Sequence, residues 1–196
     1  MATEIPGNLW LAELWQEHKE RLLKLLTLRM PPVLLRRLSP EDLLQETYLA
    51  CGARLDFLQA EPQVPIYVKL RRIALQTLAD QERYHLGAGK RDAMKESTPD
   101  SDDQTDGAMD AWAGFADSIS SPRSHIEKLE RRAIIRRLLR EMPETDREIL
   151  QLRHFEEMSN RECAAALGIA EKAASIRYVR ALKRFQEAVN GTGFFS

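Results

Sequence analysis

Residues 158–185 constrain the fold more than any other part of this chain. They read MSNRECAAALGIAEKAASIRYVRALKRF, with Gly168 between an alanine-rich half and a basic half. The spacing of apolar residues predicts one helix from 160 to 167 and a second from about 171 to 189. A glycine between them supplies a left-handed C-terminal cap, because it adopts positive φ without steric cost. The segment therefore predicts a helix-turn-helix.

The second of these helices has two chemically different faces. One is predicted to pack on the preceding helices and holds Ala174, Tyr178, Ala181, Leu182, Phe185 and Val189. The other holds Arg177, Arg180 and Arg184, with Ala173, Ile176 and Lys183 alongside. Guanidinium groups suit guanine edges and phosphates, and small apolar groups suit thymine methyls. An ordinary solvated surface is the alternative interpretation, but the glycine and the predicted first helix favour DNA binding.

The remaining sequence also has helical periodicity, and no run alternates as a strand would. We therefore expect an all-α protein. Helices are predicted over 8–28, from Ser39-Pro40 to about Phe57, from Pro65 to about His85, and over 123–141. Capping boxes are predicted where a hydroxyl precedes a carboxylate by three residues, at Thr145 with Glu148 and at Ser159 with Glu162.

A polar segment separates two small helical domains. Residues 96–121 contain seven acidic residues and no Lys or Arg. This leaves 23 of the 30 acidic residues for the rest of the chain, against all 29 basic residues. The composition predicts a flexible acidic linker between domains at 1–95 and 122–196. Trp112 and Phe115 are its apolar exceptions, for which docking on a domain and solvation are both open.

Several function classes find little support in the sequence. Cys51 and Cys163 form no metal-binding or disulfide pattern and suit a reducing cytoplasm. The four histidines lie in separate elements, and neither a phosphate-binding loop nor a nucleophile motif is present. We expect no enzyme, no cofactor and no metal. The apolar runs are short and no secretory signal pattern is found, so no membrane association is expected.

The N-terminal half contains two further surfaces of interest. The helix from 65 to 85 places Lys69, Arg72, Gln76, Asp80 and Arg83 in one narrow stripe, which predicts a polar and basic surface. The preceding helix is predicted to bury its apolar side and to expose acidic and polar groups that suit a protein partner. The residues predicted buried are Leu43, Thr47, Tyr48 and Leu55, and those predicted exposed are Asp42, Gln45 and Glu46.

Together these segments strongly resemble the extracytoplasmic-function (ECF) group of bacterial sigma factors. SPEDLLQETY and KLRRIALQTLADQERY are similar to two motifs of the family's region two. MPETDREILQLR and SNRECAAALGIAEKAASIRYVRALKRF are similar to two motifs of its region four. The motifs occur in the family's order, and the resemblance covers nearly the whole chain outside the linker. Where the family has Trp and Asn this chain has Lys69 and Gln76, and Ala173 and Ala174 replace Thr and Val.

The resemblance implies a promoter-specificity subunit of RNA polymerase. In the family, region two binds the clamp coiled coil of core polymerase and melts the minus-ten element, and region four reads the minus-thirty-five element and touches the flap. An anti-sigma protein is a further candidate partner. The resemblance implies that the loop 58–65 captures a flipped base. The matching residues are Asp42, Leu43, Gln45 and Glu46 for core polymerase; Lys69, Arg72, Gln76, Asp80 and Arg83 for minus-ten DNA; and Lys172, Ser175, Ile176, Arg177, Arg180, Lys183 and Arg184 for minus-thirty-five DNA.

Two alternatives stay open. A free-standing helix-turn-helix regulator would bind a palindrome as a dimer, whereas a sigma factor acts as a monomer within the holoenzyme. The formal net charge of -1 favours the second, because proteins that bind free DNA indiscriminately have a large basic excess.

The acidic linker either occupies the RNA exit path as a mimic of the transcript backbone or only keeps the connection extended and soluble.

Overall fold

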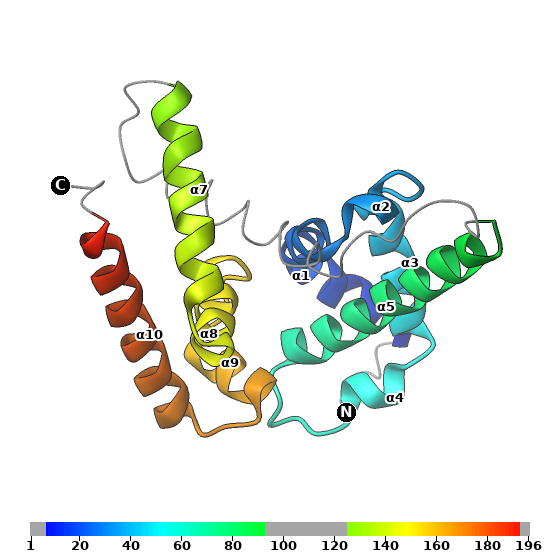
Figure 1. Cartoon of the computed structure of the whole chain (residues 1–196). Coiled ribbons are helices and arrows are strands. Elements are labelled where there is room, and N and C mark those ends of the chain that lie inside the picture. The colour runs from blue at the N-terminus through cyan, green and yellow to red at the C-terminus, as the bar shows by residue number, and fades with distance from the viewer. Residues whose placement is uncertain (1–6, 93–124, 193–196) are drawn as a thin grey trace. The chain divides into compact units, whose positions relative to one another are not determined.

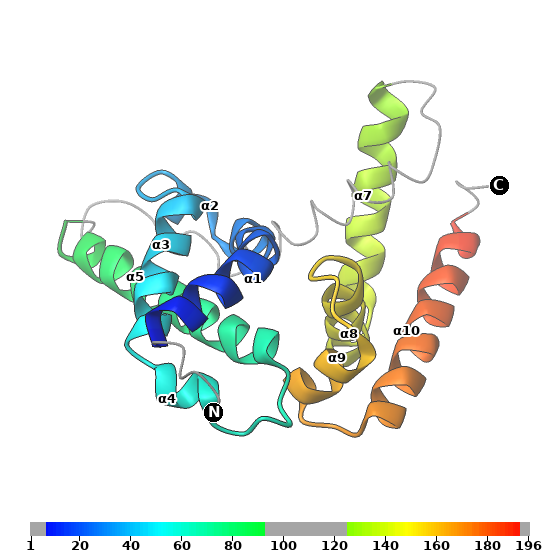
Figure 2. The ribbon, with the colours of Figure 1, turned by 180° about the vertical axis from the view of Figure 1, so that it is seen from behind.

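The chain is described by a computed structural model covering residues 7–92 and 125–192. These residues form α-helices and connecting turns, which confirms the all-α prediction (Figures 1 and 2). Contacts divide the chain into two compact units, Met1–Gln104 and Thr105–Ser196. The predicted acidic linker, with Trp112 and Phe115, lies outside the described residues.

The first unit packs three helices on one another. α1 (Gly7–Arg29), α3 (Pro40–Gly52) and α5 (Ile66–Asp92) contact each other, while α2 (Pro32–Leu35) and α4 (Leu55–Gln59) are short connections (Figure 1). The core side chains come from all three long helices and include Leu22, Leu26, Leu43, Tyr67, Leu70 and Ile73. Their burial, not helix propensity alone, stabilises these segments.

Two predicted helix boundaries in this unit are wrong. The helix that starts at Pro40 ends at Gly52 and does not reach Phe57, because a turn at Ala53 and Arg54 precedes α4. Arg54 has φ -130° and ψ 36°, which is outside the helical range. In contrast, α5 continues past His85 to Asp92 through two glycines. Interior glycines cost a helix only about 1 kcal/mol each, so they do not necessarily end one.

The second unit consists of α7 (His125–Glu141), α8 (Glu144–His154), α9 (Asn160–Leu167) and α10 (Glu171–Gly191). α10 contacts all three of the other helices, and α8 also contacts α9. Buried side chains of α7 and α8 form much of the core, among them Ile135, Leu139, Ile149, Leu150 and Leu152. Ala174 and Ala181 of α10 are fully buried, as the predicted packing face requires.

The predicted caps of this unit differ in outcome. α9 has the predicted capping box at Ser159, but α8 begins one residue before Thr145, with Pro143 at the N-cap position and no side-chain cap. Thr145 therefore lies inside the helix and its predicted capping box with Glu148 is wrong. Within the described residues, no helix has the length and apolar character needed to cross a membrane.

Candidate nucleic-acid interface

The helix-turn-helix of α9 and α10 is fixed by local bonds at each end of α9. At its start, Ser159 Oγ accepts from the Glu162 amide at 3.2 Å, and Glu162 Oε2 accepts from the Ser159 amide at 2.7 Å. At its end, Gly168 has φ 63° and ψ 33°, the predicted left-handed cap. These bonds satisfy backbone groups that a helix end leaves unpaired. The sequence prediction of this motif is confirmed in both helix positions and cap.

A side-chain bond that the sequence analysis missed also joins the two helices. Asn160 Nδ2 donates to the carbonyl oxygen of Glu171 at 2.9 Å. Asn160 is the first residue of α9 and Glu171 the first of α10. The bond therefore fixes the start of α10 relative to α9, the relation that sets how a recognition helix is presented. No local spacing signal marks a contact across 11 residues.

The exposed face of α10 is rotated from the one predicted. Its outward residues are apolar as well as basic: Ile176 is 58% exposed and Val179 is 61% exposed. Leu182, predicted to pack, is 40% exposed, so that prediction is wrong, whereas Arg177 is half-buried. The remaining predicted minus-thirty-five residues are exposed, namely Lys172, Ser175, Arg180, Lys183 and Arg184. The surface thus offers cations for phosphates with apolar groups for thymine methyls.

Two of these arginines contact a buried carboxylate on α8. Asp146 has a side chain with no exposed area, and Arg184 Nη1 donates to its Oδ2 at 2.6 Å. Arg180 Nη2 lies 3.9 Å from Oδ1 of the same carboxylate. The guanidinium of Arg184 is therefore committed to α8, which differs from the expectation that it points to DNA. Sequence reasoning missed Asp146, since nothing local distinguishes it from the other acidic residues of that helix turn.

An aromatic contact supports the other flank of α10. Tyr178 Oη lies 3.2 Å from His154 Nε2, and the guanidinium of Arg153 is 5.2 Å from the Tyr178 ring centroid. Arg153 also donates to the Met158 carbonyl at 2.7 Å, in the turn before α9. Burial, and to a lesser degree Arg153, lowers the pKa of His154 below its usual value. The neutral imidazole thus fits between α8 and α10.

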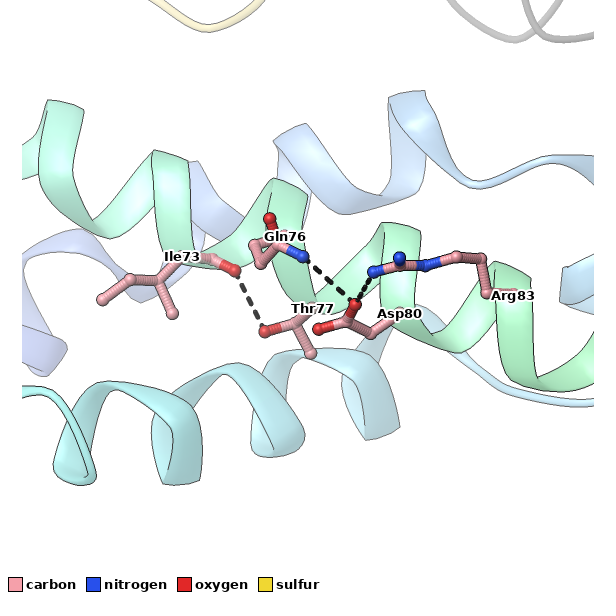
Figure 3. Close-up of polar contacts among 5 residues, drawn as sticks. All are labelled: Ile73, Gln76, Thr77, Asp80 and Arg83. Carbon is pink, nitrogen blue, oxygen red and sulfur yellow. Dashed lines mark hydrogen bonds and ion pairs between the residues drawn. The ribbon is translucent and has the colours of Figure 1, made fainter.

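In the first unit, three residues of the predicted stripe on α5 are joined by polar contacts (Figure 3). Gln76 Nε2 donates to Asp80 Oδ1 at 3.1 Å, and Arg83 pairs with the same oxygen. The guanidinium of Arg72 lies 5.8 Å from the centroid of the Phe57 ring on α4. Arg72, Gln76, Asp80 and Arg83 are all exposed, as predicted. An exposed aromatic beside cations is a surface on which single-stranded nucleic acid can bind.

Lys69 does not belong to this exposed stripe, and its predicted placement there is wrong. Its side chain is buried, with a residue exposure of 5%. Nζ donates to the carbonyl of Leu58 at 3.0 Å and also to that of Ala60. These oxygens lie at the end of α4, where the chain enters the loop before α5. Lys69 satisfies backbone acceptors there, and so fixes the start of the loop instead of facing solvent.

The predicted core-polymerase residues on α3 fall into three groups. Leu43 is fully buried, as the helical pattern predicted, and it packs in the core of the first unit. Asp42 is exposed but completes the cap of α3: Oδ2 accepts from the Ser39 amide at 3.2 Å and from Ser39 Oγ at 2.7 Å. The Ser39 hydroxyl, then the Ser39 amide, lowers the pKa of Asp42. Gln45 and Glu46 remain exposed.

An apolar groove lies next to Gln45, between α1 and α3. It is lined by Ala12, Trp15, Gln16, Leu44, Gln45, Tyr48 and Leu49. The Trp15 and Tyr48 rings meet edge to face with centroids 5.0 Å apart, and Leu49 is 65% exposed. An exposed leucine beside a groove with acidic residues nearby is suited to a partner helix of basic and apolar character.

Within the described residues no cluster of His, Cys, Asp or Glu could hold a metal ion.

Comparisons with known proteins agree with this geometry. Residues 132–185 match the family model Sigma-70, region 4, so the second unit contains a sigma-70 region 4 domain. An 85-residue part of the chain is 28% identical to the RNA polymerase sigma factor SigF of two strains of Mycobacterium tuberculosis. That match covers 43% of this chain and 33% of the relatives, so the chain matches about a third of their length.

One solved structure is also similar to this chain. It is described as CnrH in complex with the cytosolic domain of CnrY, and is 20% identical to this chain with a TM-score of 0.49. The match covers 92% of this chain and 88% of the other.

Proposed function

We propose that this chain is a sigma factor of the ECF type, which binds core RNA polymerase and directs it to promoters. One observation carries the proposal: the sigma-70 region 4 match falls on a capped helix-turn-helix whose second helix exposes cations and apolar groups together. The chain is then a specificity subunit without catalytic groups of its own, and it acts where RNA polymerase acts, in the cytoplasm.

In this proposal α10 reads the minus-thirty-five element. Lys172, Ser175 and Ile176 stand in its first two turns and are exposed, at the end of a recognition helix that usually meets base edges. Ile176 supplies a surface for thymine methyls, and Lys172 and Lys183 supply charges for phosphates. Arg177 is half-buried and therefore reaches DNA only along the flank of the helix.

The first unit would contact the minus-ten element through α5. Arg72, Gln76 and Arg83 form an exposed polar surface, with Phe57 beside Arg72 at one end. The loop 58–65, which the resemblance assigns to capture of a flipped base, begins at carbonyl groups bound by Lys69. Lys69 would then position the loop instead of touching DNA. A loop fixed in advance holds an unstacked base at a lower entropy cost than a mobile one.

The contact with core polymerase would use α3 and the adjoining groove. Gln45, Glu46 and Leu49 offer acidic, polar and apolar groups on one exposed side, which suits the clamp coiled coil. The flap would contact the second unit, and an anti-sigma protein remains a further partner to test. The domain functions follow the two units: core binding and minus-ten DNA in the first, minus-thirty-five DNA in the second.

Size-exclusion chromatography of the full chain with core RNA polymerase tests the proposal. We expect co-elution, and at least tenfold weaker association of a Gln45→Lys/Glu46→Lys variant, about 1.4 kcal/mol. Asp42 is unsuitable for this test because its replacement removes one half of the capping box of α3. Glu20→Lys, a charge reversal at an exposed site of α1, is the matched control and should bind normally. A chain that elutes as a dimer without binding polymerase would instead be a free-standing regulator.

A further inference from the structure

Asp146 holds two arginines of α10 in unequal ways. The carboxylate is fully buried, and its Oδ2 accepts a hydrogen bond from Arg184 at 2.6 Å. Its Oδ1 accepts no hydrogen bond within the described part of the chain, and Arg180 Nη2 lies 3.9 Å away. The first distance is that of a strong charged hydrogen bond, whereas the second is too long for a hydrogen bond. Arg184 is thus fixed and Arg180 is only attracted.

The position of Asp146 lets another anion displace it from Arg180 but not from Arg184. Asp146 lies in the first turn of α8, where the helix dipole favours a negative charge. Arg184 and Arg180 are one helical turn apart on α10, with side chains 49% and 58% exposed. Arg180 is therefore close enough to the carboxylate to be attracted, and exposed enough to leave it for a phosphate. A second anion near α10 would compete with Asp146 for Arg180 but not for Arg184.

We infer that Asp146 is a positioning residue with two effects. Its hydrogen bond to Arg184 fixes α10 on α8, and its charge restrains Arg180 from binding DNA phosphates regardless of sequence. This rests on the proposed function, since it concerns DNA held by α10. Correctly seated promoter DNA draws Arg180 away from Asp146, while a poorly seated duplex does not. The carboxylate would thereby lower non-specific affinity more than specific affinity, and so contribute to discrimination between sequences.

The test compares two duplexes bound by holoenzyme assembled from the full chain and core polymerase. One is the duplex enriched from a randomised pool by the wild-type holoenzyme, and the other is the same duplex with its upstream element scrambled. Affinity is measured over a range of salt concentrations. With Asp146→Asn we expect the slope of log affinity against log salt on the scrambled duplex to steepen by about 0.9, one added phosphate contact. The ratio of the two affinities should fall by about threefold to tenfold.

Double variants identify which arginine is released. The effect of Asp146→Asn should vanish in an Arg180→Gln background and persist in an Arg184→Gln background. A merely structural carboxylate would weaken binding to both duplexes in proportion and leave the salt slope unchanged. An unchanged slope, or an effect that instead depends on Arg184, overturns the inference.

Circular dichroism establishes that each variant is folded before binding is measured. If Asp146→Asn does not fold, the single and double arginine variants suffice. Arg184→Gln should let Asp146 capture Arg180. On the enriched duplex, Arg180→Gln, Arg184→Gln and the double variant should therefore share one slope, about 0.9 shallower than wild type, and on the scrambled duplex all three should keep the wild-type slope. Additive changes would contradict this. If the wild-type chain forms no holoenzyme or enriches no duplex, the proposed function itself fails, which is a different outcome from a normal holoenzyme with an unaltered slope.

Discussion

The two units satisfy the charges of their surface helices differently. On α5, Asp80 bonds Gln76 and Arg83, residues four and three positions away on the same helix (Figure 3). On α10, Arg180 and Arg184 pair with Asp146 of another helix, and Arg184 is 38 residues away from it. Asp80 is 50% exposed and Asp146 is fully buried. A local exposed pair contributes little to stability, whereas a buried pair between helices fixes their arrangement.

Loss of a buried charge in the first unit should have the largest effect on stability. Lys69→Ala removes the donor for the Leu58 and Ala60 carbonyls together with a packed side-chain stem. We expect the free energy of unfolding of the first unit to fall by about 3 kcal/mol. Hydrogen exchange measured by mass spectrometry reports each unit of the full chain separately. Arg72→Ala, an exposed change on the same helix, should alter the free energy of unfolding by less than about 0.5 kcal/mol. Equal losses in the two variants would mean that the Lys69 bonds to the Leu58 and Ala60 carbonyls do not stabilise the first unit.

The same substitution at the two bridging carboxylates compares the units directly. Asp146→Asn should destabilise the second unit by about 2 kcal/mol, because Arg184 loses its charged partner in a buried setting. Asp80→Asn should change the first unit by less than about 0.5 kcal/mol, because its partners are exposed. Denaturant unfolding with exchange readout measures both. Similar losses at the two sites would remove the distinction between them.

A smaller change in stability is expected when a hydroxyl group is removed from the second unit, and its size should differ between Ser159 and Thr145. Ser159→Ala should cost about 1 kcal/mol, since it removes the cap bond to the Glu162 amide. Thr145→Ala should be nearly neutral, because Thr145 makes no cap bond at the start of α8. Thermal unfolding of both variants checks this. A loss at Thr145 as large as that at Ser159 would restore the capping box predicted there.

The smallest expected effect is on how the stability of the second unit depends on pH. The pKa of His154 is lowered in the folded chain by burial and Arg153, while an unfolded histidine titrates near 6.5. As pH falls through about 6.5, the unfolded state takes up a proton first, so the second unit loses stability on the acidic side. His154→Gln should flatten this dependence in melts from pH 8 to 5. Tyr178→Phe, which removes only the hydroxyl contact, should retain it.

The first unit contains a buried thiol, Cys51, whose pKa is raised, whereas the pKa of His154 in the second unit is lowered. Desolvation raises the pKa of Cys51 to about 12. Cys51 should therefore resist alkylation in the native chain at neutral pH and react on denaturation, as mass spectrometry of iodoacetamide-treated protein would show. Rapid native labelling at Cys51 would indicate that the α1, α3 and α5 core opens readily.

Sequence reasoning succeeded where the determining contacts are local. The cap at Ser159, the left-handed Gly168 and the α5 stripe depend on neighbours within a turn, and the all-α fold follows from periodicity. It failed where burial depends on a distant element, as for Lys69. Asp146 was missed because its partners become visible only once α8 and α10 are packed.

Transcription by the reconstituted holoenzyme is the most direct test of the central claim. Core RNA polymerase is assayed with and without the full chain on the duplex that the holoenzyme enriches from a randomised pool. A sigma factor should give discrete start sites that appear only with the chain and disappear when the upstream element is scrambled. Transcripts that do not depend on the chain, with the chain binding the duplex as a dimer in the absence of polymerase, would contradict the account.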